Sequence, residues 1–201
     1  MGFRVGVLIS GEGTNLQAIL DTLHGRDGIE VVCVGSSRAD AGGLERARRS
    51  GIETAVHARA GQPDRDARDA ALGNWLDDHS VDLVVLAGFM EVLGGPFIQR
   101  FQGRIVNVHP SLLPAFPGLR AIEQAIEYGV RVMGVTVHFV EEGVDSGPVI
   151  LQECFEPGPL KGIERQVHEI EHRLLPRAVR LIATGAVSID PSRPRRVRVR
   201  E

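Results

Sequence analysis

The stretch "FRVGVLISGEGTNLQAILDTLH", residues 3–24, places a strand, a glycine-rich turn and a helix in direct succession. Residues 3–10 are almost continuously apolar, which is typical of a strand buried on both faces of a sheet. Residues 14–24 carry apolar side chains at helical spacing. A buried strand followed at once by a helix predicts an α/β fold with parallel strands.

The same alternation continues through most of the chain. Further apolar runs predict strands over residues 29–37, 53–58, 81–88 and 104–109, with helices over 43–51 and 64–80 between them. A helix is predicted over 121–129 and a long last helix over 162–185. Between these two helices, strands over 132–140 and 148–155 are joined by a short turn, which favours an antiparallel pair.

We therefore predict a single α/β domain over residues 1–190, with a Rossmann-like, mostly parallel twisted sheet, an antiparallel edge and flanking helices. Residues 191–201 concentrate arginines and form a basic C-terminal tail. Because no aromatic residues are interleaved with the arginines, a solvated or frayed end is favoured over a nucleic-acid-binding arm.

Composition and charge restrict the partners. The formal net charge of −3 gives no overall electrostatic case for nucleic acid or an anionic membrane, so the partners have to be inferred from individual sites. No apolar run has the length of a membrane span and no secretory leader opens the chain, which predicts a cytoplasmic protein. Cys33 and Cys154 lack C-x-x-C spacing and are expected to be reduced thiols. A monomer and a homodimer both remain open.

The segment "SGEGTNLQ", residues 10–17, lies where a strand gives way to a helix. Free N–H groups and the helix dipole favour an anion there, and Gly11 and Gly13 let the backbone approach it closely. Leu16 occupies the third glycine position of the dinucleotide fingerprint, and the lysine of a Walker loop is missing. A phosphate monoester therefore fits better than a dinucleotide. The alternative is a tight turn with Thr14 or Asn15 as the helix N-cap.

The segment "RIVNVHPSLLP", residues 104–114, ends a predicted central strand with two polar side chains. Asn107 and His109 are two residues apart, so they project to the same face at the edge where α/β sheets bind ligands. An amide donor beside an imidazole suits acyl transfer, in which one group stabilises an oxyanion and the other moves a proton. A carboxylate would be needed to orient the imidazole. Three carboxylates of the later turn are open candidates: Glu141, Glu142 and Asp145.

The segment "HEIEH", residues 168–172, matches the H-E-x-x-H zinc pattern on a predicted helix. A catalytic zinc needs a third protein ligand, and no histidine follows this segment. We therefore interpret it as the polar face of an amphipathic helix and expect no metal.

Six segments taken together closely resemble the folate-dependent phosphoribosylglycinamide formyltransferases of purine synthesis. They are "VLISGEGTNLQAIL", "SSRADAGGLERARRSGI", "VDLVVLAGFMEVL", "RIVNVHPSLLPAFPG", "GVTVHFVEEGVDSGPVILQ" and "EIEHRLLP". The resemblance implies a formyltransferase fold and an enzyme that transfers the formyl group of 10-formyltetrahydrofolate to the amine of 5-phosphoribosylglycinamide (GAR). It implies no metal.

The resemblance also implies roles for individual residues. The implied catalytic trio is Asn107, His109 and Asp145. The implied GAR-binding residues are Gly13, Thr14, Asn15, His168, Glu169, Ile170 and Glu171. The implied folate-binding residues are Arg65, Met90, Glu91, Val92, Leu93, Asn107, Glu141, Glu142, Gly143, Val144 and Asp145. "HEIEH" then becomes part of a substrate surface.

Two positions depart from the family pattern. Glu91 stands where relatives often carry a basic residue. Arg120 replaces a usual histidine, so it would either pair with Asp145 or point to solvent. Three other functions remain open: a formyltransferase for another amine acceptor, a 10-formyltetrahydrofolate hydrolase, and a nucleotide-binding regulatory module on the same fold.

Overall fold

The computed structural model describes residues 2–159 and 161–200. The chain forms two compact units, Met1–Val106 and Asn107–Glu201, which are described separately below. Residues 1 and 201, the outer ends of the predicted domain and tail, lie outside the described residues. The boundary predicted at residue 190 stays a prediction.

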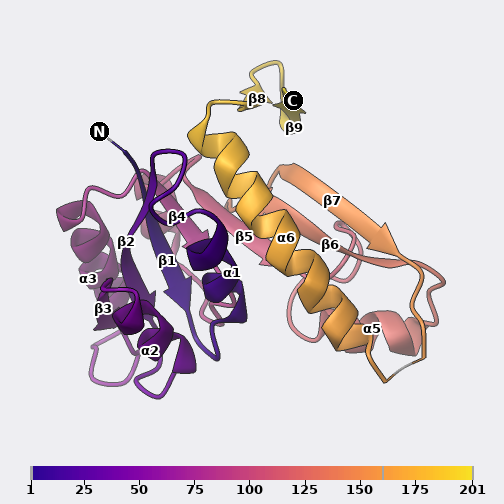
Figure 1. The fold of residues 1–201 in the computed structure, drawn as a ribbon, viewed down its shortest axis with the longest axis horizontal. Helices are drawn as coiled ribbons and strands as arrows, with labels where there is room; N and C mark the ends of the chain where they lie inside the picture. The colour runs from indigo at the N-terminus through magenta and orange to yellow at the C-terminus, as the bar shows by residue number, and fades with distance from the viewer. Residues whose placement is uncertain (1, 160, 201) are drawn as a thin grey trace. The chain divides into compact units, whose positions relative to one another are not determined.

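The first unit is a parallel sheet with helices (Figure 1). Its strands are β1 (Phe3–Ile9), β2 (Ile29–Ser36), β3 (Glu53–Val56) and β4 (Leu83–Leu86), in the order β3-β2-β1-β4, and all of these pairs are parallel. Its helices are α1 (Thr14–Thr22), α2 (Gly42–Arg49), α3 (Arg65–Asp78) and α4 (Gly95–Arg100). Strand β5 (Ile105–His109) begins in this unit and ends in the second.

Glycines in β1 and β2 let α3 pack closely on the sheet. A Cβ on Gly6 would lie 2.8 Å from Leu76 Cδ2, and one on Gly35 would lie 3.2 Å from Trp75 Cζ3. The four residues of β4 are all buried, as the apolar run predicted. Burial of apolar surface around these central strands supplies the main stabilisation of the unit.

The second unit combines an antiparallel strand pair with a long helix. Its elements are α5 (Ala121–Tyr128), β6 (Met133–Phe139), β7 (Val149–Phe155), α6 (Ile163–Ala183), β8 (Val187–Asp190) and β9 (Arg193–Val199). Helix α6 lies along β6 and β7 (Figure 1) and buries the apolar stripe that includes Val167, Leu174 and Val179. The predicted α/β class, the parallel strands and the antiparallel pair are confirmed.

The sequence did not predict helix α4 or the hairpin of β8 and β9. Of the expected solvated or frayed C-terminal end, the frayed alternative is wrong, because β9 pairs with β8 from Val187↔Val199 to Ile189↔Val197. Most side chains of β9 are exposed, which agrees with the solvated alternative. The alternation of Arg and Val in "RVRVR" is a strand pattern, and Arg198 closes the hairpin with an ion pair to Asp190 at 2.6 Å. In the described part of the chain, every helix is too short or too polar to span a bilayer.

Gly42 and Gly43 are adjacent at the start of α2 and allow a matched test of how this helix packs against residues 9–13. A Cβ on Gly43 would lie 2.5 Å from Ile9 Cδ1 and 3.1 Å from Gly13 Cα, whereas the nearest atom to one on Gly42 belongs to the exposed Glu12 side chain. We expect Gly43→Ala to lower the free energy of unfolding by about 1–3 kcal/mol through overpacking. Gly42→Ala should leave it unchanged or raise it slightly, because alanine favours helix. Urea denaturation measures both, and equal effects would contradict this packing.

Candidate active site

The end of β5 carries the two polar residues that the sequence singled out. Asn107 is half-buried and His109 is buried, and both lie in the strand as predicted. Proline-rich residues 110–117 then leave the sheet as an irregular loop. The second unit contains His109 and the two groups that contact its ring nitrogens, the Asp145 carboxylate and the Phe116 carbonyl.

His109 is held from both sides of its imidazole. Its Nδ1 lies 3.2 Å from Asp145 Oδ2, and its Nε2 lies 2.8 Å from the carbonyl oxygen of Phe116. A carbonyl oxygen only accepts hydrogen bonds, so Nε2 carries a hydrogen and donates it. A protonated, cationic ring satisfies both neighbours at once, which suits a group that stabilises negative charge.

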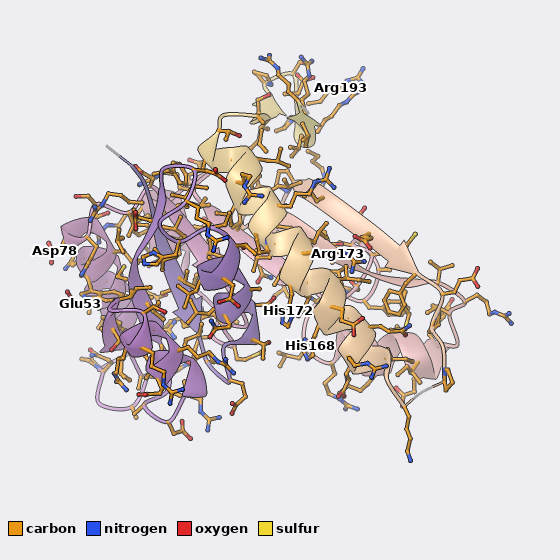
Figure 2. All side chains as sticks on the ribbon, viewed as in Figure 1. Glu53, Asp78, His168, His172, Arg173 and Arg193 are labelled. Atoms are coloured by element: carbon orange, nitrogen blue, oxygen red, sulfur yellow. The ribbon has the colours of Figure 1, made fainter. Side chains whose placement is uncertain are left out.

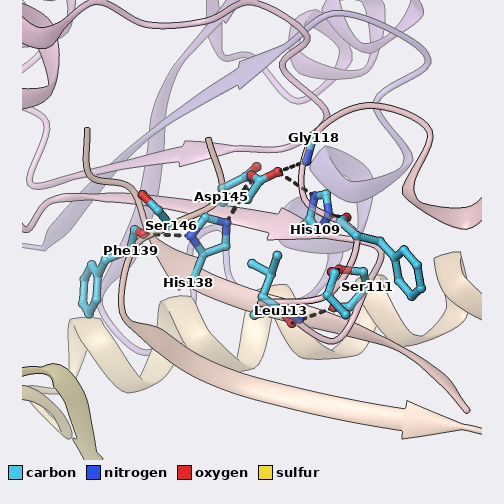
Figure 3. A network of polar contacts seen from close by, with 12 residues as sticks. His109, Ser111, Leu113, Gly118, His138, Phe139, Asp145 and Ser146 are labelled. Atoms are coloured by element: carbon cyan, nitrogen blue, oxygen red, sulfur yellow. Dashed lines mark hydrogen bonds and ion pairs between the residues drawn. The ribbon is translucent and has the colours of Figure 1, made fainter. Parts of the chain in front are cut away.

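Asp145 is the centre of this cluster (Figure 3). Its backbone has a left-handed φ of 47°, and its Oδ2 accepts the N–H of Gly118 at 2.7 Å. Burial acts to raise the pKa of Asp145, but contacts with His138, the Gly118 N–H and His109 outweigh it and hold the pKa below its usual value. The carboxylate is therefore ionised at neutral pH and can hold a cation beside it.

Asn107 faces the other oxygen of Asp145. Its Nδ2 lies 3.4 Å from Asp145 Oδ1 and 3.3 Å from His138 Nε2. Turning the amide over would place its oxygen against the carboxylate, so the amide nitrogen must face Asp145. Both contacts are long and therefore weak, and this leaves the amide able to donate to a bound substrate instead.

His138 is a buried member of the cluster that the sequence analysis missed. Its Nδ1 lies 2.8 Å from the Phe139 carbonyl oxygen and donates to it, while its Nε2 faces Asn107 and lies 3.6 Å from Asp145 Oδ1. The available signal was a single histidine in the mostly apolar stretch "VTVHFV", directly before the turn that carries Asp145. A buried polar residue at such a strand end needs a polar partner.

Side chains of β6 and β7 fix the loop that follows β5. Thr136 on β6 is fully buried; its hydroxyl donates to the Ser111 carbonyl oxygen at 2.7 Å and accepts the Leu113 N–H at 3.1 Å. Gln152 on β7 donates to the Leu113 carbonyl oxygen at 2.9 Å. These bonds set the position of residues 110–117, and with it the Phe116 carbonyl that His109 contacts.

The glycine-rich loop of the first unit has the form of an anion site. Gly13, with φ of 72°, is the N-cap of α1, and within the described chain no side chain hydrogen-bonds to this cap position. The alternative that Thr14 or Asn15 caps the helix is therefore wrong. Arg46 on α2 braces the loop by donating from Nε to the Glu12 carbonyl oxygen at 2.8 Å, and it adds positive charge there. The sequence analysis missed this arginine.

The predicted folate-binding segment of the first unit follows β4. Met90 and Val92 are 66% and 63% exposed, whereas Leu93 is buried. Glu91 pairs with Arg68, at 3.2 Å between Oε2 and Nη1. Arg65, at the start of α3, is partly exposed and lies 3.6 Å from Asp66.

The remaining predicted ligand residues of the second unit lie on α6 and in the turn before β7. Glu171 is buried, and its Oε2 lies 3.0 Å from Nδ1 of the exposed His168, on the side of α6 from which His172 also projects (Figure 2). Glu169 is exposed, but the Ile170 side chain is buried in the core. The predicted turn residues Glu141, Glu142, Gly143 and Val144 are all exposed.

Arg120 does not pair with Asp145. Its side chain is 74% exposed and lies 3.8 Å from Glu123, one turn along α5. Of the two alternatives for this departure, the structure therefore supports a side chain that points to solvent.

Comparisons with known proteins agree on the family of this chain. The model of the family described as formyl transferase matches residues 3–179. The phosphoribosylglycinamide formyltransferase of Haemophilus influenzae is 41% identical over 190 residues, which cover 92% of this chain and 90% of that protein. The trifunctional purine biosynthetic protein adenosine-3 of Homo sapiens is 44% identical over 193 residues, and the chain spans only 19% of its length.

A solved structure extends the agreement to the whole fold. The crystal structure of glycinamide ribonucleotide transformylase 1 from Symbiobacterium toebii has a TM-score of 0.94 and 50% identity, and the match covers 100% of this chain and 95% of that one. Since both the family model and the Haemophilus relative cover most of its length, the chain belongs to the formyl transferase family, among the phosphoribosylglycinamide formyltransferases.

Proposed function

We propose that this chain transfers the formyl group of 10-formyltetrahydrofolate to the amine of 5-phosphoribosylglycinamide, giving formyl-GAR and tetrahydrofolate in purine biosynthesis. The observation that carries the proposal is the cluster in which Asp145 faces His109 on one side and Asn107 on the other. An ionised carboxylate, an imidazole and an amide donor together suit formyl transfer to an amine.

The first step forms a carbon–nitrogen bond. The amine nitrogen of GAR attacks the formyl carbon, and the formyl oxygen gains negative charge. Asn107 releases its long contacts with Asp145 and His138 and donates to this oxygen. His109, held as a cation between Asp145 and the Phe116 carbonyl, adds positive charge beside it.

The second step breaks the bond between the formyl carbon and N10 of the folate. The attacking amine loses one proton, and N10 gains one from His109, so charge and atoms balance. Asp145 is a weak base because its pKa is lowered. Its role is therefore to hold the imidazolium and to pass the amine proton on through water. No metal takes part in this route.

Substrate binding in this proposal uses the other predicted residues. The phosphate of GAR binds at Gly13, Thr14 and Asn15, and His168 to Glu171 contact the same substrate. The folate binds at Arg65, the segment Met90 to Leu93, and the turn Glu141 to Val144. The cytoplasmic location and the choice between monomer and homodimer stay predictions.

Turnover with GAR and 10-formyltetrahydrofolate tests the catalytic assignment. We expect His109→Ala to abolish most activity, and Asn107→Ala to lower kcat by roughly 10² to 10³ because one oxyanion donor is lost. Circular dichroism should show an intact fold in both variants. Near-normal turnover by His109→Ala would refute the assignment, and folate deformylation without GAR would indicate a hydrolase.

A pair of threonines on α1 tests the phosphate loop. Thr14 is the first residue of the helix, and Thr22 is its last. We expect Thr14→Ala to raise KM for GAR several-fold, because the loop loses a donor beside the phosphate, while Thr22→Ala leaves KM unchanged. Steady-state kinetics with each substrate varied in turn measures this. An effect on KM for the folate alone would contradict a phosphate loop.

The lowered pKa of Asp145 predicts how stability depends on pH. A carboxyl whose pKa is lower in the folded state stabilises the fold above its unfolded pKa of about 3.9, and this contribution is lost as pH falls through the folded pKa. The difference in unfolding free energy between the wild type and Asp145→Asn should therefore shrink as pH falls from about 6 to about 3. Urea titrations at several pH values measure it, and a difference independent of pH would argue against the ionised carboxylate.

A further inference from the structure

Two charged side chains of α3 are buried in the first unit. Arg68 is 1% exposed and Asp69 is 4% exposed, although charged residues are rarely buried so fully. Burial of a charge is costly unless the group is paired and hydrogen-bonded. Here Nε of Arg68 donates to Asp69 Oδ1 at 2.8 Å, which neutralises both groups. We call these two residues the α3 clamp.

The α3 clamp holds the segment that follows β4. Arg68 Nη2 donates to the Val92 carbonyl oxygen at 3.2 Å, and its Nη1 lies 3.2 Å from Glu91 Oε2. Asp69 Oδ2 accepts the N–H of Gly94 at 2.7 Å. The atoms of Arg68 and Asp69 that do not bind each other therefore contact residues 91–94: the Val92 carbonyl, the Gly94 N–H and the Glu91 side chain.

A further hydrogen bond holds the start of the same segment. The hydroxyl of Ser10, at the end of β1, accepts the Met90 N–H at 2.9 Å and is itself 2.6 Å from the Ser37 hydroxyl. The backbone from Met90 to Gly94 is thus fixed at three points. Yet the Met90 and Val92 side chains are largely exposed, which is unfavourable for a segment with only a structural role.

We infer that Arg68 and Asp69 are positioning residues for the formyl-folate substrate: they hold residues 90–94 so that Met90 and Val92 face the ligand. This inference rests on the proposed function. The inference depends on the forked shape of the guanidinium group. Because this group has several nitrogens, one Arg68 side chain contacts Asp69, Val92 and Glu91 at the same time. Arg68 also places a cation against Glu91, at a position where relatives often carry their own basic residue.

The substitution Arg68→Lys tests the fork while keeping the buried positive charge. A lysine cannot reach all three partners, so the segment loosens and must be ordered when the folate binds. We expect KM for 10-formyltetrahydrofolate, and Kd for 5-deazatetrahydrofolate measured by calorimetry, to rise about tenfold. KM for GAR should stay within about twofold of the wild type. Arg49→Lys, which changes an exposed arginine of α2 paired with Glu45, is the matched control and should change neither constant.

Glu91→Gln provides a second variant that leaves the buried pair intact. It should raise KM for the folate about threefold alone and have no further effect in the Arg68→Lys background, because both changes act through one contact. Additive effects would overturn the inference. An unchanged folate KM in both single variants, or an equal rise in both KM values, would also overturn it. If Arg68→Lys fails to fold, Asp69→Asn decides by the same two KM values, because an asparagine keeps an acceptor for the Gly94 N–H but loses the charge that pairs with Arg68.

Direct binding separates this inference from the proposed function. If the wild type binds 5-deazatetrahydrofolate but transfers no formyl group to GAR, the proposed acceptor is wrong, and a weaker Kd in Arg68→Lys still supports the inference. If the wild type turns over GAR and Arg68→Lys binds the folate analogue as tightly as the wild type, the inference fails and the proposed function stands. Failure of the wild type to bind the analogue would overturn both.

Discussion

The carboxylate of Asp145 is the contact around which the active cluster is organised. One oxygen accepts the Gly118 N–H and faces the His109 ring, and the other faces Asn107 and His138. The turn before β7 supplies the carboxylate, the end of β5 supplies both His109 and Asn107, the end of β6 supplies His138, and the loop after β5 leads to Gly118. Burial acts to raise the pKa of Asp145, and the contacts with His138, the Gly118 N–H and His109 outweigh it, so these partners favour the ionised carboxylate. The charge state of the cluster and the positions of its loops therefore depend on each other.

Polar side chains fix three loops of the candidate site. Thr136 holds the loop after β5, Arg46 and the contact of Gly13 with Gly43 brace the phosphate loop, and Arg68 with Asp69 holds the segment after β4. Fixing a loop before the substrate arrives lowers the ordering cost of binding and holds reacting groups in place. This is why charged and hydroxyl groups are kept in places where an apolar residue would cost less to bury.

Much of the fold could be predicted from local pattern. Apolar runs located the five strands from β1 to β5, and helical spacing located α6, because buried strands and amphipathic helices leave a period in the sequence. Helix α4 is too short to show such a period. The hairpin of β8 and β9 was missed because its arginines were interpreted only as charge, although they alternate with valines that pair across the strands. In the candidate site, Asn107 and His109 could be found because they share a face at a strand end.

The sequence by itself determined the order of strands and helices, the paired side chains at the end of β5 and the family resemblance, since each is a property of residues close together in the chain or of motifs in series. Only the tertiary structure decided which groups touch. It brought His138 beside Asn107, placed Asp145 against His109 and directed Arg68 at Glu91 and Val92. Such contacts join residues up to tens of positions apart, and they follow from how helices and strands pack, which no local period records.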